Sequence, residues 1–285
     1  MGQLRDRMEA DLTIAGYSPG TKRIYLLYAK QFAAHHRRSP AELGSEEIRQ
    51  FLLYLIVERG ISRSTFKQVH AALRFLYSVT LRRAVEIEWV PVGRNPKRLP
   101  DVLSGTEVQS FLSAVRNPKY RALFTTMYAS GLRISEACRL RPENIDSKRM
   151  VIQVIGKGNQ ERLTVLSPRL LNDLRCYWKD VRPEGEWLFP NEKKNRFISA
   201  ESVRRAFHKA IASAGIEKKV TPHALRHSFA THLIDTGTDV TTVQALLGHK
   251  NLRTTSLYTH ATVGRIAQTR CPYDFLGTSA AQVLG

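Results

Sequence analysis

The sequence predicts a mainly α-helical protein that carries one small antiparallel β-sheet, an α+β fold. Apolar residues recur at helical spacing through most of the 285 residues, which is typical of helices that bury one face. The period changes to that of strands at residues 150–155 and 161–166, where two β-branched runs flank a glycine-containing turn. A proline-rich stretch at residues 91–103 divides the helical pattern into two parts.

The first 90 residues predict a helical domain of four helices separated by short breaks. Ser18-Pro19 and the run from Ser45 to Glu47 are signals of helix starts, and Gly16 and Gly60 fall where helices end. The predicted helices cover residues 3–15, 18–38, 45–59 and a stretch that begins near residue 64.

The fourth of these helices has a polar face that carries Lys67, His70 and Arg74. Such a stripe is usually only a solvated helix face. In a chain with 44 Lys and Arg against 25 Asp and Glu, it fits a DNA phosphate backbone equally well. Both interpretations stay open on the sequence alone.

Residues 91–103 predict an extended linker between the two helical parts. Proline stiffens the backbone and ends helices, and the stretch PVGRNPKRLPDVL holds three prolines. Arg94, Lys97 and Arg98 give it positive charge, so it is a candidate strap across a DNA backbone.

Residues 104–285 predict a second domain in which helices surround the β-hairpin. Ser104 and Glu107 form a helix-start signal, and Gly156 and Gly158 flank Lys157 at the hairpin tip. Helices are predicted from residue 104, then over about 119–130, 168–180, 199–213, 222–235 and 239–247, with a tail from about 262.

The charge balance favours a polyanionic partner. The formal net charge is +19, and the excess is spread over both parts of the chain. Since each neutralised phosphate releases condensed counterions, nucleic acid is the predicted partner. The alternatives are a soluble protein that is merely basic and a protein that binds acidic membranes. No stretch is apolar enough to span a membrane, no signal-peptide core opens the chain, and three scattered cysteines do not form a disulfide framework. We therefore expect a cytoplasmic, reduced protein.

Four short segments concentrate the residue types that perform chemistry. They hold Arg133 in GLRISE, Lys157 in GKG, His223 and Arg226 in HALRHS, and His249 in LLGH with Tyr258 after it. Singly, each has an ordinary structural explanation, such as an arginine paired with Glu136 one turn away, a solvated turn lysine or a helix-end glycine. What is specific is that all four segments occur together and in this order.

In that order, the segments closely resemble the tyrosine recombinase (phage integrase) family, which includes lambda-type integrases and Xer-like recombinases. The motifs cover about residues 104–260, and the helical front half resembles the family's core-binding domain. The resemblance implies a SAM-like core-binding domain at 1–90, a linker at 91–103 and a tyrosine-recombinase catalytic domain at 104–285. The tail after about residue 262 does not match the family's familiar tail helix.

The resemblance also implies a role for each of six residues. Arg133 and Arg226 hold the non-bridging oxygens of the scissile phosphate, Lys157 protonates the leaving 5′ oxygen, His223 and His249 orient the phosphate and assist proton movement, and Tyr258 attacks. Glu136 is a support residue. These types suit the reaction, because arginine forks match phosphate oxygens and a tyrosine hydroxyl needs a proton acceptor to become a nucleophile.

The predicted activity is site-specific DNA recombination, without a metal or another cofactor, through a 3′-phosphotyrosine and a Holliday junction. The predicted partners are double-stranded DNA with inverted-repeat core sites and further copies of the chain, as a tetramer on two sites. Movement of a mobile element and resolution of replicon dimers both stay open as its biological role. DNA relaxation like that of a type IB topoisomerase and a catalytically silent DNA-binding protein stay open as alternatives. Against a metal site for the histidines stands the lack of HExxH, CxxC and paired acids.

Overall fold

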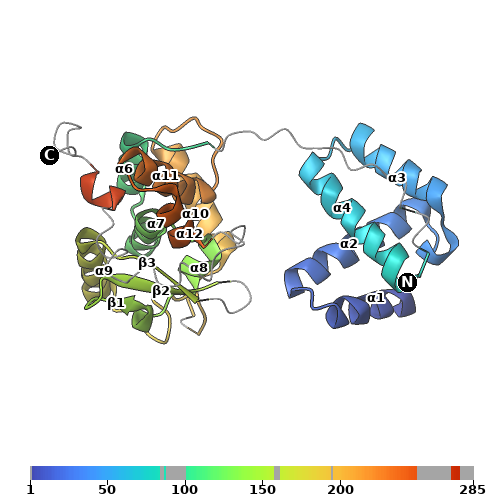
Figure 1. Cartoon of the computed structure of the whole chain (residues 1–285), viewed down its shortest axis with the longest axis horizontal. Coiled ribbons are helices and arrows are strands. Elements are labelled where there is room, and N and C mark those ends of the chain that lie inside the picture. Colours follow the sequence, from blue (N-terminus) through green and yellow to red (C-terminus); the bar gives the residue numbers. More distant parts are fainter. Residues whose placement is uncertain are drawn as a thin grey trace. The chain divides into compact units, whose positions relative to one another are not determined.

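A computed structural model describes residues 2–83, 87, 101–156, 161–193, 195–248 and 271–276. The chain divides into two units, Met1–Arg98 and Leu99–Gly285 (Figure 1), and each unit has a hydrophobic core of its own. Among the described residues, no helix is both long and apolar enough to cross a lipid bilayer.

The described residues of unit 1 include four α-helices, as the sequence predicts. They are α1 (Gly2–Ile14), α2 (Pro19–His36), α3 (Ser45–Val57) and α4 (Arg63–Phe75), with a short turn η1 (Pro40–Glu42) and a π-helical turn η2 (Leu76–Thr80). The side chains of Ser18 and Ser62 cap α2 and α4, because each hydroxyl accepts a hydrogen bond from an N–H of the first turn. Phe32 lies at the centre, with its ring edge-to-face against those of Phe51 and Tyr77.

Unit 2 packs helices around one three-stranded antiparallel sheet, which confirms the predicted α+β class. Its helices are α6 (Gly105–Ala114), α7 (Pro118–Ser130), α8 (Ile134–Cys138), α9 (Pro168–Val181), α10 (Ala200–Ser213), α11 (His223–Asp235) and α12 (Val240–Leu247), with short turns η3 (Pro142–Asn144) and η5 (Pro272–Phe275). Every residue of α7 from Ala122 to Ser130 is buried, and α7 packs against α9 and α11. The buried α7 therefore forms the axis of this unit.

The predicted hairpin is present as β2 (Val151–Ile155) and β3 (Glu161–Val165), which pair in antiparallel register from Val151 opposite Val165 to Ile155 opposite Glu161. A third strand, β1 (Ile145–Asp146), pairs with β2 and is not predicted from the sequence. The hydroxyl of Thr164 in β3 donates to the carbonyl of Ser130 at a distance of 2.8 Å. This hydrogen bond fixes the hairpin to the end of α7.

The last described segment, residues 271–276, docks on α7 and α9 of its own unit. Cys271 and Tyr273 are buried, and the Cys271 thiol donates to the carbonyl of Ala129 at 3.0 Å. The Tyr273 hydroxyl donates to Asp173. The Arg169 guanidinium lies over the Tyr273 ring, 4.6 Å from its centroid, and donates to the carbonyls of Tyr273 and Leu276. The segment is thus held by burial, a cation–π contact and hydrogen bonds together.

We predict that Tyr273→Ala lowers the free energy of unfolding by about 3 kcal/mol, because it removes a buried ring and leaves a cavity. Tyr273→Phe keeps the ring and loses the hydrogen bond to Asp173, so it should cost about 1 kcal/mol. Urea unfolding measures both values. Arg175→Ala, on the exposed side of α9, is the control and should change stability by less than about 0.5 kcal/mol. Equal effects of all three substitutions would contradict the docking.

Candidate active site

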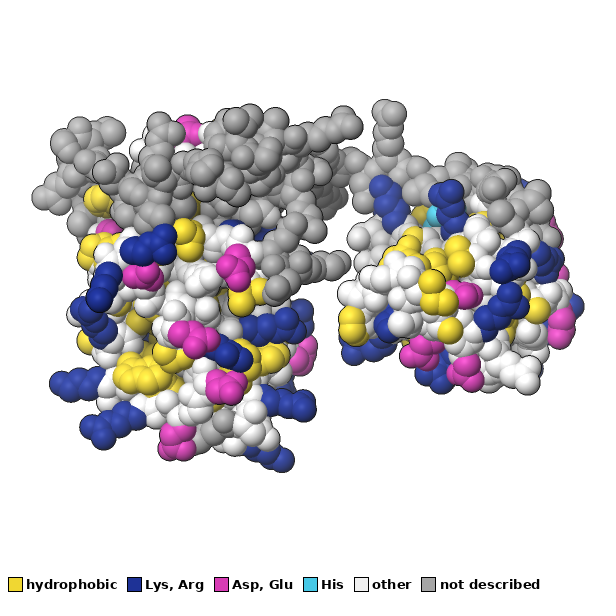
Figure 2. Space-filling model, turned by 60° about the horizontal axis from the view of Figure 1, so that its bottom comes forward, with side chains coloured by type: hydrophobic (Ala, Val, Ile, Leu, Met, Phe, Trp, Pro, Cys, Tyr) yellow, Lys and Arg dark blue, Asp and Glu magenta, His cyan; other side chains and the backbone are white. Residues whose placement is uncertain are grey.

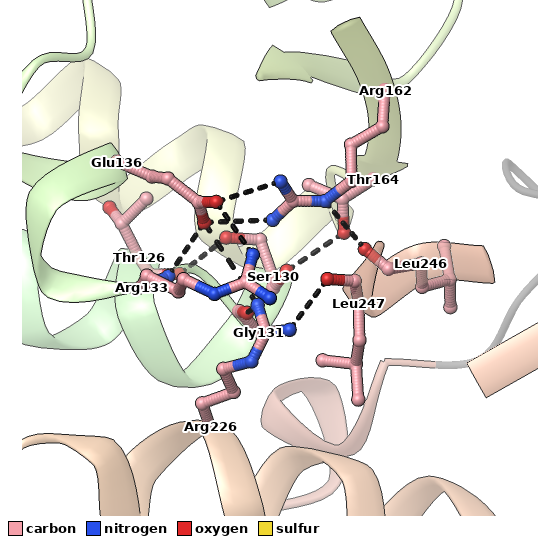
Figure 3. A network of polar contacts seen from close by, with 10 residues as sticks. All are labelled: Thr126, Ser130, Gly131, Arg133, Glu136, Arg162, Thr164, Arg226, Leu246 and Leu247. Carbon is pink, nitrogen blue, oxygen red and sulfur yellow. Dashed lines mark hydrogen bonds and ion pairs between the residues drawn. The ribbon is translucent and has the colours of Figure 1, made fainter. Parts of the chain in front are cut away.

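The buried carboxylate of Glu136 is the centre of a polar network in unit 2 (Figure 3). Glu136 is 7% exposed. Its Oε1 accepts from Nη1 of Arg133 and from Nη1 of Arg162, both at 2.9 Å. Its Oε2 accepts from Nη2 of Arg162 and from the backbone N–H of Arg133, both at 2.8 Å. Nη1 of Arg226 lies 3.9 Å from Oε2. One carboxylate thus faces three guanidinium groups.

Arg133 reaches this network because the chain turns sharply between α7 and α8. Gly131 ends α7 with φ of 64°, in the left-handed region that glycine adopts without strain. A Cβ on Gly131 would lie 2.6 Å from a ring carbon of Phe229 and 2.9 Å from a methyl carbon of Leu247. The turn places Arg133 at the N-cap of α8, with 37% of its side chain exposed. Its guanidinium therefore contacts both Glu136 and solvent.

Arg226 enters the network from α11 and is almost completely buried, at 5% exposure. Its Nη1 donates to the carbonyl of Gly131 at 2.7 Å, and its Nη2 donates to the carbonyl of Leu247 at 2.5 Å. These carbonyls belong to the ends of α7 and α12, which otherwise leave acceptors without helical partners. The contacts fix the guanidinium between three helices.

The charges in this site shift the pKa values of its members. Burial by itself raises the pKa of the Glu136 carboxyl, but the hydrogen bonds and charge of Arg162, with the hydrogen bonds from Arg133, outweigh it and hold that pKa at about 2. Burial and the positive charges of Arg133 and Arg162 lower the pKa of Arg226 to about 9. Both groups are therefore charged at neutral pH, and positive charge is in excess.

His223 begins α11, one turn before Arg226. Loss of hydration lowers its pKa below the usual value, and the charges of His227, Arg226 and Arg133 lower it further. A neutral imidazole at neutral pH is able to accept a proton. The structure thus brings together three residues that the sequence predicts as catalytic: Arg133, His223 and Arg226.

The other predicted site residues have different outcomes. Lys157, His249 and Tyr258 lie outside the described residues, and so do Arg94, Lys97 and Arg98 of the predicted strap. Lys67 and Arg74 are exposed on α4, and Figure 2 shows lysine and arginine side chains distributed over the visible face of both units.

His70 does not lie on the exposed stripe that the sequence predicts. It is 8% exposed, because α4 buries a broad face that includes Val69, Ala72 and Leu73 as well. Its Nε2 has no hydrogen-bond partner within the described part of the chain. Burial and the charge of Arg74 lower its pKa, which favours the neutral form.

His232 lies away from the network, where its Nδ1 is 2.9 Å from the Tyr128 hydroxyl. This contact joins the side chains of α7 and α11. Among the described residues, no three His, Cys, Asp or Glu side chains gather as a metal site would require.

Arg162 is the one of the three arginines around Glu136 that the sequence does not single out. It stands at the second position of β3, and its side chain is 12% exposed. An arginine that follows a polar turn is usually a solvated residue. Only the approach of β3 to α8 and α12 in space reveals its partners.

Comparisons with known proteins agree with this arrangement. The phage integrase family model matches residues 101–265, and the model of the phage integrase N-terminal SAM-like domain matches residues 4–87. A putative integrase/recombinase of Sinorhizobium fredii is 44% identical over 278 residues, which are 97% of this chain and 90% of that protein. The tyrosine recombinase XerA of Thermococcus onnurineus is 33% identical over 275 residues, 95% of each chain. The fold is also that of a lambda integrase dimer bound to a core site, with a TM-score of 0.72 at 19% identity over 90% of this chain and 76% of that one.

We predict that Glu136→Gln destabilises the protein in a pH-dependent manner. Because the folded-state pKa of Glu136 is about 2 against 4.5 ordinarily, the ionised carboxylate stabilises the fold above about pH 4.5, by about 3 kcal/mol. This contribution declines as the pH falls toward 2. Urea unfolding of both proteins between pH 7 and 3.5 should show the difference shrinking below pH 4.5. The control Glu143→Gln changes a carboxylate that is 69% exposed, and its effect should stay small. A difference for Glu136→Gln that is constant with pH would contradict the assignment.

Proposed function

This chain belongs to the phage integrase family of tyrosine recombinases, enzymes of site-specific DNA recombination, and we propose that it cuts and rejoins DNA through a 3′-phosphotyrosine on Tyr258. One observation carries the proposal. Arg133 and Arg226, from two different helices, meet at the same carboxylate of Glu136. They form a preorganised cationic site for a phosphate, with His223 close by.

The proposed reaction exchanges one phosphodiester for another. The Tyr258 oxygen attacks the phosphorus, the bond to the 5′ oxygen breaks, and Lys157 donates the proton that this oxygen needs. His223 and His249 assist the transfer of the phenolic proton. A 5′ hydroxyl then attacks the phosphotyrosine, releases Tyr258 and restores the backbone. Since one ester replaces another, the reaction uses no ATP.

Arg133 and Arg226 supply the electrostatic part of catalysis. In-line attack raises the negative charge on the non-bridging oxygens, and fixed donors that face those oxygens lower the barrier. The three guanidinium groups carry more positive charge than the Glu136 carboxylate carries negative charge. Because the fold itself holds these groups together, the surplus positive charge is in place before DNA binds. A phosphate at the exposed side of Arg133 would balance that excess. The loss of one such donor typically costs about 10²–10³ in rate.

The DNA partner follows from the reaction and the charge. A net charge of +19 suits a chain that contacts DNA with both of its parts. We propose that residues 1–90 act as a core-binding domain, residues 91–103 as a linker and residues 104–285 as the catalytic domain. Four copies on two inverted-repeat core sites exchange strands through a Holliday junction, which suits the movement of a mobile element.

Tyr258→Phe tests the nucleophile. We expect wild type, incubated with nicked DNA that carries a specifically bound site, to form a covalent adduct in EDTA on a denaturing gel. The variant has no phenolic oxygen, so it should bind the same DNA and form no adduct. If neither protein forms an adduct, the chain is a DNA-binding protein without this activity. Relaxation of supercoiled DNA without any strand exchange between two sites would favour a topoisomerase-like reaction.

Lys67 and Arg74 are proposed to contact DNA phosphates from the surface of α4. Each substitution to alanine should weaken binding and reduce the slope of log K against log salt by about 1, as for one lost phosphate contact. His70→Gln is a control on the same helix, because His70 is buried and should leave the slope unchanged. Gel-shift titrations at several salt concentrations give the slopes. Unchanged slopes for both surface variants would place the DNA elsewhere.

A further inference from the structure

Arg162 has no role in the reaction proposed above, yet it makes half of the hydrogen bonds to Glu136. Its Nη1 and Nη2 donate to the two carboxylate oxygens at 2.9 and 2.8 Å, in the parallel geometry that suits a guanidinium and a carboxylate. Its Nε donates to the carbonyl of Leu246 at 3.0 Å. All three nitrogens are thus engaged by protein acceptors. With all three of these nitrogens engaged, Arg162 is placed to organise the site rather than to bind DNA.

The acceptor sites of Glu136 are all occupied. A carboxylate offers about four lone-pair sites. Arg162 fills two of them, and the backbone and side chain of Arg133 fill the other two. Nη1 of Arg226, at 3.9 Å from Oε2, is too far for a hydrogen bond. Arg226 instead donates to the carbonyls of Gly131 and Leu247. Arg226 therefore keeps its contacts with these two carbonyls because other donors already occupy the acceptor sites of Glu136.

Removal of Arg162 would open two acceptor sites on a buried anion. An unsatisfied buried carboxylate is unfavourable, and the nearest cations able to satisfy it are Arg226 and Arg133. Either would turn toward Glu136, and its N–H donors would no longer face a phosphate. The positive excess of the site would also fall by one charge.

We propose that Arg162 is a positioning residue that saturates Glu136 and so keeps Arg133 and Arg226 available for the scissile phosphate. The inference rests on the proposed function, because it concerns the same phosphate site.

The end of α12 supports this position for Arg162. Gly248 follows α12 with φ of 63°, and a Cβ there would lie 2.8 Å from Cδ of Arg162. The glycine of the LLGH segment thus leaves room for the Arg162 side chain beneath α12. The same side chain joins β3, which begins four residues after Lys157 in the sequence, to the end of α12, which comes just before His249 in the sequence. Through its contacts with Glu136 and with the carbonyl of Leu246, Arg162 thus links these two parts of the predicted catalytic set.

A double-mutant cycle on the full chain tests the proposal. The variants are Arg162→Met, Glu136→Gln and the two combined, with single-turnover cleavage of nicked site DNA and DNA affinity as separate readouts. Arg162→Met should reduce the cleavage rate by about 10²-fold and leave DNA affinity within about threefold. In the Glu136→Gln background, where no carboxylate remains to capture the arginines, the same substitution should reduce the rate by less than about threefold.

The pH dependence of the cleavage rate provides a second readout. Because hydrogen bonds and charge from Arg162 are what chiefly lower the pKa of Glu136, that pKa should rise in Arg162→Met. Protonation at lower pH would then release the captured arginines. The cleavage rate of Arg162→Met relative to wild type should therefore increase as the pH falls from 7 to 5. A purely structural role for Arg162 would not produce this trend.

Arg175→Met, an exposed arginine on α9, is the matched control and should cleave like wild type. If Arg162→Met unfolds, Arg162→Lys, which keeps the charge and loses the paired donation to Glu136, replaces it in both Glu136 backgrounds. An equal loss of rate in both Glu136 backgrounds, or wild-type cleavage by Arg162→Met, would overturn the proposal. The absence of a Tyr258 adduct in wild type would instead refute the proposed function itself.

Discussion

The pairing of one buried carboxylate with three guanidinium groups is the interaction on which the rest of the site depends. A lone buried carboxylate is strongly unfavourable, and so is a lone buried guanidinium. Here the ionised Glu136 compensates part of the charge of Arg133, Arg162 and Arg226. The remaining positive charge has no anion among the residues of this network. Burial and this imbalance together lower the pKa of Arg226 and cost stability in the free protein, and the imbalance favours an incoming phosphate.

The fold serves this pairing by bringing the ends of several elements to one point. The C-terminus of α7, the N-terminus of α8, the start of β3 and the C-terminus of α12 all supply donors or acceptors to the network. Two left-handed glycines, Gly131 and Gly248, allow the chain to leave α7 and α12 without placing a Cβ in this space. Helix ends have unsatisfied carbonyl groups, and Arg226 binds two of them. The same contacts that complete the helices therefore hold the site.

Local signals in the sequence predict most of the fold and part of the site. Caps such as Ser18 and Ser104, the glycines at helix ends and the change of period at the hairpin are short-range features, and the helices and the hairpin follow from them. β1 is only two residues long, too short to carry a periodic pattern. His70 is a different case. A helix that buries only a narrow face would expose it, but α4 buries a broader face that includes His70. Arg162 depends wholly on long-range contacts, which no local pattern encodes.

The three arginines differ in how far the protein satisfies them, and this difference separates their roles. Arg162 gives all three nitrogens to protein acceptors and is 12% exposed. Arg226 is held by two carbonyls through Nη1 and Nη2, so the protein engages two of its five N–H donors, against three of the five of Arg162. Arg133 gives one side-chain nitrogen to Glu136 and is 37% exposed. Because a phosphate binds best to donors that need not leave another partner, Arg133 and Arg226 are suited to it and Arg162 is not. Arg133 and Arg226, which belong to the family-like motifs, are thus also the two arginines with fewer donors engaged by the protein. Arg162, which has the most donors engaged, keeps the other two in place.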